Sequence, residues 1–413
     1  MENKRTYIPF TEEMKKDYTI LVPNMLPMHF KLMIQVMKNY GYKAELLETG
    51  GPDIPETGLK YVHNDTCYPA IVVIGQLMTA LQSGKYDMDK VALMLFQTGG
   101  GCRASNYVSL LRKALKKAKL EQVPVIGFGI AGVEKHPGMS LSLSQFYKIM
   151  HAIIYGDLLM SLVNQVKPYE TEQGTAEKLA ESWMNKLSDE LATKRISYKK
   201  VKENYRNILK EFGEIPMVKT DKVKVGVVGE IFVKYSPLGN NNLERFLYDE
   251  GAEVVVPGLL DFFMYCVFNP INDAKLYGMN KGLAAAYKLV YKFLLKRQKD
   301  IIDIVKEHGM FMPATPFDTT VSLTKGYIGL GTKMGEGWLL TAEMLELAHE
   351  GVKNIICTQP FGCLPNHICG KGMMKPIKEK NADVNIVAID YDAGATAVNQ
   401  ENRIKLMLAN SKM

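Results

Sequence analysis

The chain has 413 residues, 47% of them hydrophobic and 23% charged, which is ordinary globular composition, and its length predicts two domains rather than a single core. Its net charge of +7 comes from scattered lysines rather than from one stripe interleaved with aromatic residues, which argues against a nucleic acid as the main partner. The N-terminus lacks the apolar core of a signal peptide, and no apolar run is long enough to span a bilayer. We therefore expect a cytoplasmic protein that does not contact a membrane.

The first part of the sequence alternates short apolar strands with helices, which is the pattern of a parallel sheet. Gly41 follows the first of these helices, where a glycine commonly ends a helix. The predicted elements are strands at 18–22, 43–48, 91–96 and 124–130, and helices at 29–40, 69–82, 106–119 and 141–166.

The second part repeats this pattern after a helical segment. Residues 168–214 are rich in Lys, Glu and Ala and have helical periodicity, and their basic run at 194–206 is expected to face solvent. A new sheet then begins at Lys222 with the same order of strand, loop, helix, glycine and strand. The predicted elements are strands at 223–233, 252–258, 354–358 and 385–391, and helices at 242–250, 280–308, 339–350 and 399–408.

Both halves end with a strand, a glutamine, a glycine-rich turn, a cysteine, a helix and a strand. The sequence therefore predicts an α/β protein with two Rossmann-like, doubly wound parallel-sheet domains, at 1–167 and 222–413, and a helical connector at 168–221. The carboxyl ends of the two sheets are expected to face each other across a cleft, because ligands of open α/β sheets bind there.

Three cysteines occupy similar places, where a loop meets a regular element. Cys102 follows an apolar strand and three glycines, and Cys363 follows an apolar strand and a tight turn of Pro and Gly. Cys67 stands in the loop NDTCYPA, just before an apolar helix. Glycines let the backbone approach a bulky inorganic ligand, and the first N–H groups of a helix stabilise a thiolate. We interpret the three thiols as one site assembled in space.

The alternative for each thiol is a packing role, because free cysteine is among the most buried residue types. Cys266 lies in an aromatic run and Cys357 lies inside an apolar strand, so both are expected to belong to the core. Cys369 is the candidate fourth ligand, although an ordinary surface or core thiol is the favoured interpretation. His63 and His367 lie near the cysteines and are expected to form loop hydrogen bonds.

The kind of metal follows from the spacing of the thiols. Structural zinc normally uses closely paired ligands such as CxxC, and the sequence contains no such pair. Long separations and glycine-flanked thiolates suit an iron-sulfur cluster better. Three thiolates would leave one iron open to a substrate, a non-protein ligand or a bridging cluster, and an open position is what allows a metal site to do chemistry.

These motifs resemble the 2-hydroxyacyl-CoA dehydratase superfamily, and within it the CoA-substrate-specific activase-related proteins, dehydratase component D and the double-cubane cluster proteins. The segments that carry the resemblance are NDTCYPA, QTGGGCRASNY, GTKMGEGWLLTAEM, QPFGCLPNH and IDYDAGATAVNQENRIKLM. The resemblance implies two Rossmann-like domains around an oxygen-sensitive cluster, of the 4Fe-4S or double-cubane kind. Carried over by motif, its ligands are Cys67, Cys102 and Cys363.

The resemblance also implies partners. A separate activase, an ATPase with an actin-like fold, is expected to deliver a low-potential electron, and a homodimer or a related subunit is a further expectation. Lys371 and Lys375, close behind Cys363, are candidates for steering the activase, with ordinary solvated lysines as the alternative.

Three functions remain open on the sequence. The first is an enzyme, an iron-sulfur reductase or an (R)-2-hydroxyacyl-CoA dehydratase-like lyase, which passes one electron to a small molecule such as an acyl-CoA. The second is a non-catalytic electron carrier or cluster-holding subunit. The third is an ATPase, suggested by the segment from Asp392 to Thr396, but that segment introduces the last helix and no GxxxxGK[ST] loop occurs. The sequence assigns no acid or base.

Overall fold

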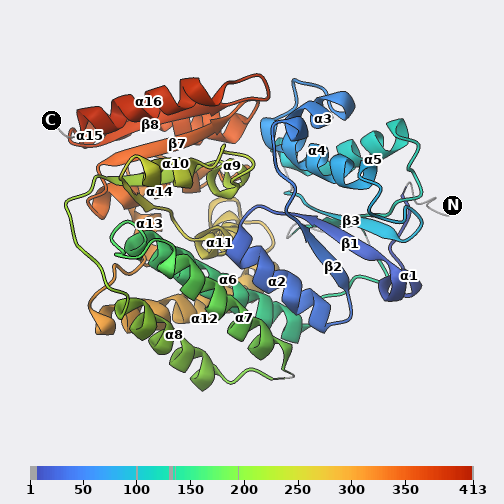
Figure 1. The fold of residues 1–413 in the computed structure, drawn as a ribbon, viewed down its shortest axis with the longest axis horizontal. Coiled ribbons are helices and arrows are strands. Elements are labelled where there is room, and N and C mark those ends of the chain that lie inside the picture. The colour runs from blue at the N-terminus through green and yellow to red at the C-terminus, as the bar shows by residue number, and fades with distance from the viewer. Residues whose placement is uncertain (1–6, 99–100, 130–133, 135, 194, 412–413) are drawn as a thin grey trace.

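The computed structural model describes residues 7–98, 101–129, 134, 136–193 and 195–411. It contains two sheets of four strands each, and every strand pair in them is parallel. Figure 1 shows α3, α4 and α5 over the first sheet, α15 and α16 beside the second, and a group of long helices below both. The mixed α/β class with two parallel sheets, predicted from the sequence, is confirmed.

The first sheet has the strand order β2-β1-β3-β4. Its strands are β1 (Thr19–Pro23), β2 (Lys43–Leu47), β3 (Val91–Phe96) and β4 (Val125–Phe128). From β1 the chain moves to one side to form β2 and then returns to the other side to form β3. The point between β1 and β3 is thus a topological switch point, outside whose carboxyl end ligands of open α/β sheets bind.

The second sheet has the equivalent order β6-β5-β7-β8. Its strands are β5 (Lys224–Gly229), β6 (Glu253–Val255), β7 (Asn354–Pro360) and β8 (Asn385–Tyr391). Strand β5 therefore corresponds to β1, and β7 corresponds to β3. The switch point of this sheet lies between β5 and β7, which are the strands that lead to Glu230 and to Cys363.

The strand predicted at 223–233 is too long, because β5 ends at Gly229. The chain leaves the sheet at Gly229, which has φ = +132° and lies so close to β7 that a Cβ there would be 2.3 Å from the carbonyl oxygen of Thr358. Glu230 then accepts a hydrogen bond from the backbone N–H of Val233 at 2.9 Å and begins α9 (Ile231–Tyr235). Only a glycine fits this exit from the sheet.

The helices of the first part include two that pack unusually closely. They are α1 (Glu12–Asp17), α2 (Pro27–Asn39), α3 (Asp53–Tyr61), α4 (Tyr68–Gln82), the 3₁₀ turn η1 (Arg103–Asn106), α5 (Tyr107–Lys117) and α6 (Leu143–Val166). The sequence did not predict α3, because Pro55 and Gly58 are helix breakers. A Cβ at Gly58 would lie 2.1 Å from the carbonyl oxygen of Ile71, so the glycine is what lets α3 contact α4.

The middle of the chain adds four long helices that share one core with α2 and α6. They are α7 (Thr175–Ala192), α8 (Tyr198–Gly213), α11 (Leu259–Tyr277) and α12 (Lys281–His308). Helices α7 and α8 lie within residues 168–221, while the connector and the domain boundaries stay predictions. The sequence missed α11, which contains Pro270 and an aromatic run. One of those aromatic rings, Tyr265, packs on the fully buried Trp338 with 5.0 Å between ring centroids.

The remaining helices complete the second part. They are α10 (Leu243–Asp249), α13 (Phe317–Leu323), α14 (Trp338–His349), the π turn η2 (Asn366–Gly370), the 3₁₀ turn η3 (Lys371–Met373), α15 (Met374–Lys380) and α16 (Ala397–Asn410). The predicted helices at 242–250, 339–350 and 399–408 match three of these within two residues at each end.

The expectation that no apolar run is long enough to span a bilayer is wrong for helix α6. By length and composition alone its 24 residues pass that test. However, 72% of its apolar window is buried inside the protein, and the core helix of a soluble protein passes the same test. Since α6 contacts α2, α7, α8 and α11, its apolar surface is used for packing.

Candidate functional site

The three predicted cysteines all lie beyond the carboxyl ends of strands or at the start of a helix. Cys102 follows β3 and begins η1, Cys363 follows β7, and Cys67 immediately precedes α4. Two of the three glycines before Cys102, Gly99 and Gly100, lie outside the described residues. The loops after β3 and β7 are equivalent, because these strands have the same place in the two sheets.

The loop that contains Cys363 packs directly against the start of α4. The backbone N–H of Tyr68 donates a hydrogen bond to the carbonyl oxygen of Phe361 at 2.9 Å. Gly362 has φ = +73°, and a Cβ there would lie 3.1 Å from the Cα of Cys67. Residues almost 300 positions apart in the sequence, Cys67 and Cys363, therefore lie in adjoining loops.

The glycine-rich segment before α14 lies against Cys102. The backbone N–H of Gly101 donates to the Sδ of Met334 at 3.1 Å. Gly335 has φ = +61°, and a Cβ at this position would lie 3.0 Å from the Cγ of Pro365 and 3.4 Å from the Sγ of Cys102. This segment therefore contacts both the Cys102 loop and the turn that follows Cys363.

The thiols share one electrostatic environment. Burial raises the pKa of Cys67 to about 12, and its Sγ lies 3.1 Å from the hydroxyl of the buried Tyr107. Burial also raises the pKa of Cys102 and of Cys363. Negative charge on Cys102 further raises the pKa of both other thiols. The loops that carry Cys67, Cys102 and Cys363 thus adjoin one another, while their assembly into one site stays a prediction.

Two buried glutamates stand beside these thiols, and sequence reasoning missed both. Glu230 and Glu336 each raise the pKa of Cys102 and Cys363. The Oε1 of Glu336 accepts a hydrogen bond from the N–H of Ile231 at 2.9 Å, so the two carboxyls lie at the same end of α9. In the sequence each of these glutamates stands next to a glycine. Glu230 does so near the end of a predicted strand, and Glu336 does so in the segment GEG.

The two carboxyls oppose each other's ionisation. Burial and then the charge of Glu336 raise the pKa of Glu230 to about 8, and burial also raises the pKa of Glu336. Near neutral pH Glu230 therefore favours its protonated form. A carboxylic acid with a pKa in this range can donate or accept a proton at neutral pH.

A buried ion pair supports this region from behind. The Nζ of Lys234 on α9 donates to the Oε1 of Glu343 on α14 at 2.7 Å, and both side chains are less than 5% exposed. The positive charge of Lys234 favours the ionised forms of Glu230 and Glu336. The pair therefore fixes α9 to α14 and keeps a cation close to the two carboxyls.

The raised pKa of Glu230 predicts a pH dependence of stability. An acid whose pKa is raised from 4.5 to about 8 on folding stabilises the fold fully below pH 4.5, and this contribution is lost as the pH rises through 8. We expect the Glu230→Gln variant, freed of metal, to lose less stability between pH 5.5 and 8.5 than the wild-type chain. The expected difference is on the order of 4 kcal/mol, measured by urea unfolding at each pH. Parallel pH profiles would contradict it.

The other cysteines are placed differently. Cys357 is fully buried within β7, near Asn366, and Cys266 lies on α11. Burial raises the pKa of Cys266 to about 12 and that of Cys369 to about 11, and Glu336 raises both further. Cys369 is buried in the π turn, and its carbonyl oxygen accepts a hydrogen bond from Thr341 at 2.6 Å.

The predicted loop histidines and the segment 392–396 have ordinary local roles. The imidazole of the exposed His63 accepts a hydrogen bond from the backbone N–H of Asp65 at 3.2 Å. The backbone N–H of His367 donates to the carbonyl oxygen of Cys363 at 3.1 Å. Asp392 accepts from the N–H of Gly394 at 2.9 Å, which closes a turn before α16.

Within the described ranges, no group of three or more His, Cys, Asp and Glu side chains is arranged to hold a metal ion. The three thiols are therefore neighbours without forming a ready site for a single ion. No family model matches the chain, and no curated protein matches it.

Proposed function

We propose that the chain is an iron-sulfur protein of the 2-hydroxyacyl-CoA dehydratase type, with a cluster held by Cys67, Cys102 and Cys363 in a cleft between two Rossmann-like domains. In this proposal it accepts a low-potential electron and passes it to a small molecule. The observation that carries the proposal is that two buried thiols and one half-buried thiol, from distant loops, share one environment beside the switch points of two equivalent sheets.

The chemistry of these residues fits such a cluster. Cys67 and Cys363 are buried and Cys102 is half-buried, and acidic side chains near them make deprotonation costly in the chain alone. Iron offsets this cost, because a metal deprotonates its thiol ligands outright and thiolates are the usual ligands of iron-sulfur clusters. When bound, the cluster supplies one-electron chemistry.

The protein's own contribution would be proton handling and exclusion of water. Loss of water from a 2-hydroxyacyl group requires a proton on the departing hydroxyl oxygen. Glu230 favours its protonated form near neutral pH, so it can give this proton to the departing oxygen, and the proton leaves with the water. We assign the proton donor to Glu230, because its carboxyl stands at the carboxyl end of β5, on the same side as the thiols.

The electron donor in this proposal is a separate ATPase activase with an actin-like fold, and the substrate is a small molecule such as a CoA thioester. A homodimer or a related subunit would complete the assembly. Lys375, whose side chain is 85% exposed, and Lys371, which is paired with Asp390 at 2.9 Å, are the proposed steering charges.

The test is the metal content of protein purified without oxygen. We expect a brown preparation with iron and acid-labile sulfide and an EPR signal on reduction. Stoichiometric zinc without labile sulfide would contradict the cluster. The activase and ATP are then used to reduce the cluster, and a 2-hydroxyacyl-CoA is added. A change in the line shape of the EPR signal on this addition would support an enzymatic function. An unchanged line shape would favour the electron carrier.

A further inference from the structure

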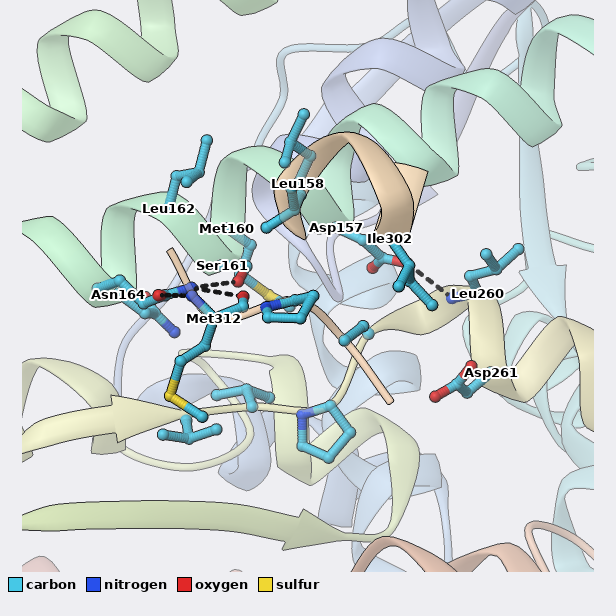
Figure 2. Close-up of a pocket in the computed structure, with 18 of the residues that line it drawn as sticks. Asp157, Leu158, Met160, Ser161, Leu162, Asn164, Leu260, Asp261, Ile302 and Met312 are labelled. Atoms are coloured by element: carbon cyan, nitrogen blue, oxygen red, sulfur yellow. Dashed lines mark hydrogen bonds between the residues drawn. The ribbon is translucent and has the colours of Figure 1, made fainter. Parts of the chain in front are cut away.

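A cavity of about 140 Å³ lies between α6, β6, α11, α12 and α14, and none of the residues that line it is a cysteine. Figure 2 shows Leu158 and Met160 of α6 on one side of it, with Leu260 and Asp261 at the start of α11 on another. None of the residues placed around the three thiols lines this cavity. Its volume has room for roughly five water molecules, or for a molecule with a few heavy atoms.

The wall of this cavity has charges of one sign only. Five carboxylic acids line it, and no Lys, Arg or His does so; the acids are Asp157, Glu253, Asp261, Glu346 and Glu350. Three of these carboxyls have partners outside the cavity. They are Asp157, bonded to His29 at 2.7 Å, Glu253, paired with Lys224 at 3.3 Å, and Glu350, bonded to Thr315 at 2.5 Å.

Asp261 and Glu346 are the two for which the described residues supply neither an ion pair nor a hydroxyl within hydrogen-bond distance, although the charge of Lys234 acts on Asp261. Asp261 accepts one hydrogen bond, from the amide of Gln298 at 2.9 Å. Glu346 is only 5% exposed, and its Oε2 is buried without any hydrogen-bond partner. The charged groups that act most on Glu346 are themselves acidic, namely Asp261, Glu350 and Glu343. Burial and the neighbouring acids raise the pKa of both carboxyls, although Thr320 lowers that of Glu346, so each holds a proton while the cavity contains no cation, and a cationic ligand would displace that proton.

The rest of the lining is apolar. Leu158 and Leu162 from α6 and Ile302 and Val305 from α12 provide aliphatic surface beside the acids. The described residues hold no group of three His, Cys, Asp or Glu side chains that could bind a metal ion, which disfavours a bare metal ion here. A ligand with both a positive charge and an aliphatic body matches both kinds of wall.

We propose that this cavity binds a small alkylammonium ion, with the ammonium group donating hydrogen bonds to Glu346 and Asp261 and the carbon chain packed against Leu158 and Ile302. The ammonium group provides three donors, which suits two acceptors that lie near each other. The site is independent of the cysteines, so it stands whether or not the chain carries a cluster.

The test is calorimetric titration of the full-length chain with 1-butylammonium chloride at pH 7.5, in a sodium buffer. Two further titrations serve as comparisons. 1-Butanol has a similar carbon chain without the positive charge, and magnesium chloride supplies a cation without a carbon chain. The Glu346→Gln variant removes the charge with little change of shape. Glu307→Gln is the matched control, because Glu307 lies on α12 and its side chain is 66% exposed.

We expect saturable binding of butylammonium to the wild-type chain and to Glu307→Gln, weakened by about tenfold or more in Glu346→Gln. If Glu346→Gln does not fold, Asp261→Asn is expected to show the same loss. The proposal is overturned by equal binding to Glu346→Gln and wild type, by butanol binding as well as butylammonium, by binding of magnesium alone, or by no saturable binding of the amine.

Discussion

We expect the Cys102→Ala variant, purified without oxygen, to lose most of its iron and acid-labile sulfide, and Cys67→Ala and Cys363→Ala to do the same. The physical reason is that each thiol enters the site from a different loop, so none can replace another. Cys102 shows this most directly, because its Sγ is in van der Waals range of the position a Cβ of Gly335 would occupy, and its charge acts on both other thiols. The measurement is iron and sulfide per chain, with circular dichroism to check folding.

Cys266→Ala is the matched control for this series. Cys266 is half-buried on α11 and Glu336 raises its pKa, and none of the main influences on the pKa of the three proposed ligands comes from it. We expect this variant to keep its iron. Full iron in Cys102→Ala together with loss in Cys266→Ala would reject the ligand assignment. Loss of iron in Cys369→Ala would indicate a fourth protein ligand and favour the electron carrier.

The second large effect is expected from Lys234→Met. This change leaves the carboxylate of Glu343 buried without its cation, and breaking a buried ion pair in this way costs about 3–5 kcal/mol. Burial already raises the pKa of Glu343, and loss of Lys234 raises it further. The loss of stability is therefore expected to be smaller at pH 5.5, where Glu343 takes up a proton more readily, than at pH 8. Urea unfolding at both pH values measures it.

Two further variants show whether the cost comes from the unpaired charge. Replacing both partners, in Lys234→Met with Glu343→Leu, removes the charge as well as its counter-ion, and we expect most of the stability to return. Lys299→Met breaks the exposed pair with Asp303 on α12 and is expected to leave the unfolding midpoint unchanged. A double variant as unstable as Lys234→Met would show that the loss comes from packing rather than from charge.

The strands were predictable because their signals are local. Buried parallel strands such as β3 and β7 are short apolar runs next to glycines, and their predicted positions agree with the structure within two residues. Helices α3 and α11 were missed because Pro55, Gly58 and Pro270 argue locally against a helix. In α3 the tertiary contact reverses this local preference, since Gly58 is what allows α3 and α4 to touch.

The same distinction applies to the candidate site. Cys102 and Cys363 stand out in the sequence because each has its own glycine-rich turn after a strand. Glu230 and Glu336 have no comparable local signal, and their importance arises from a contact between residues 106 positions apart. No spacing rule predicts that Glu336 reaches the start of α9. The cavity beneath α6 was equally hidden, because its acids come from four separate elements.

The separation of Cys363 from the other two thiols has a consequence for how the protein is made. Cys363 follows Cys102 by 261 residues, and ribosomes add about 5–20 residues per second. The first sheet and its two thiols therefore leave the ribosome roughly 10–50 s before the third thiol exists. During this interval Cys67 and Cys102 lack the β7 loop that packs against α4 in the finished protein. Any cluster bound by all three can therefore be completed only once Cys363 has been made, late in synthesis.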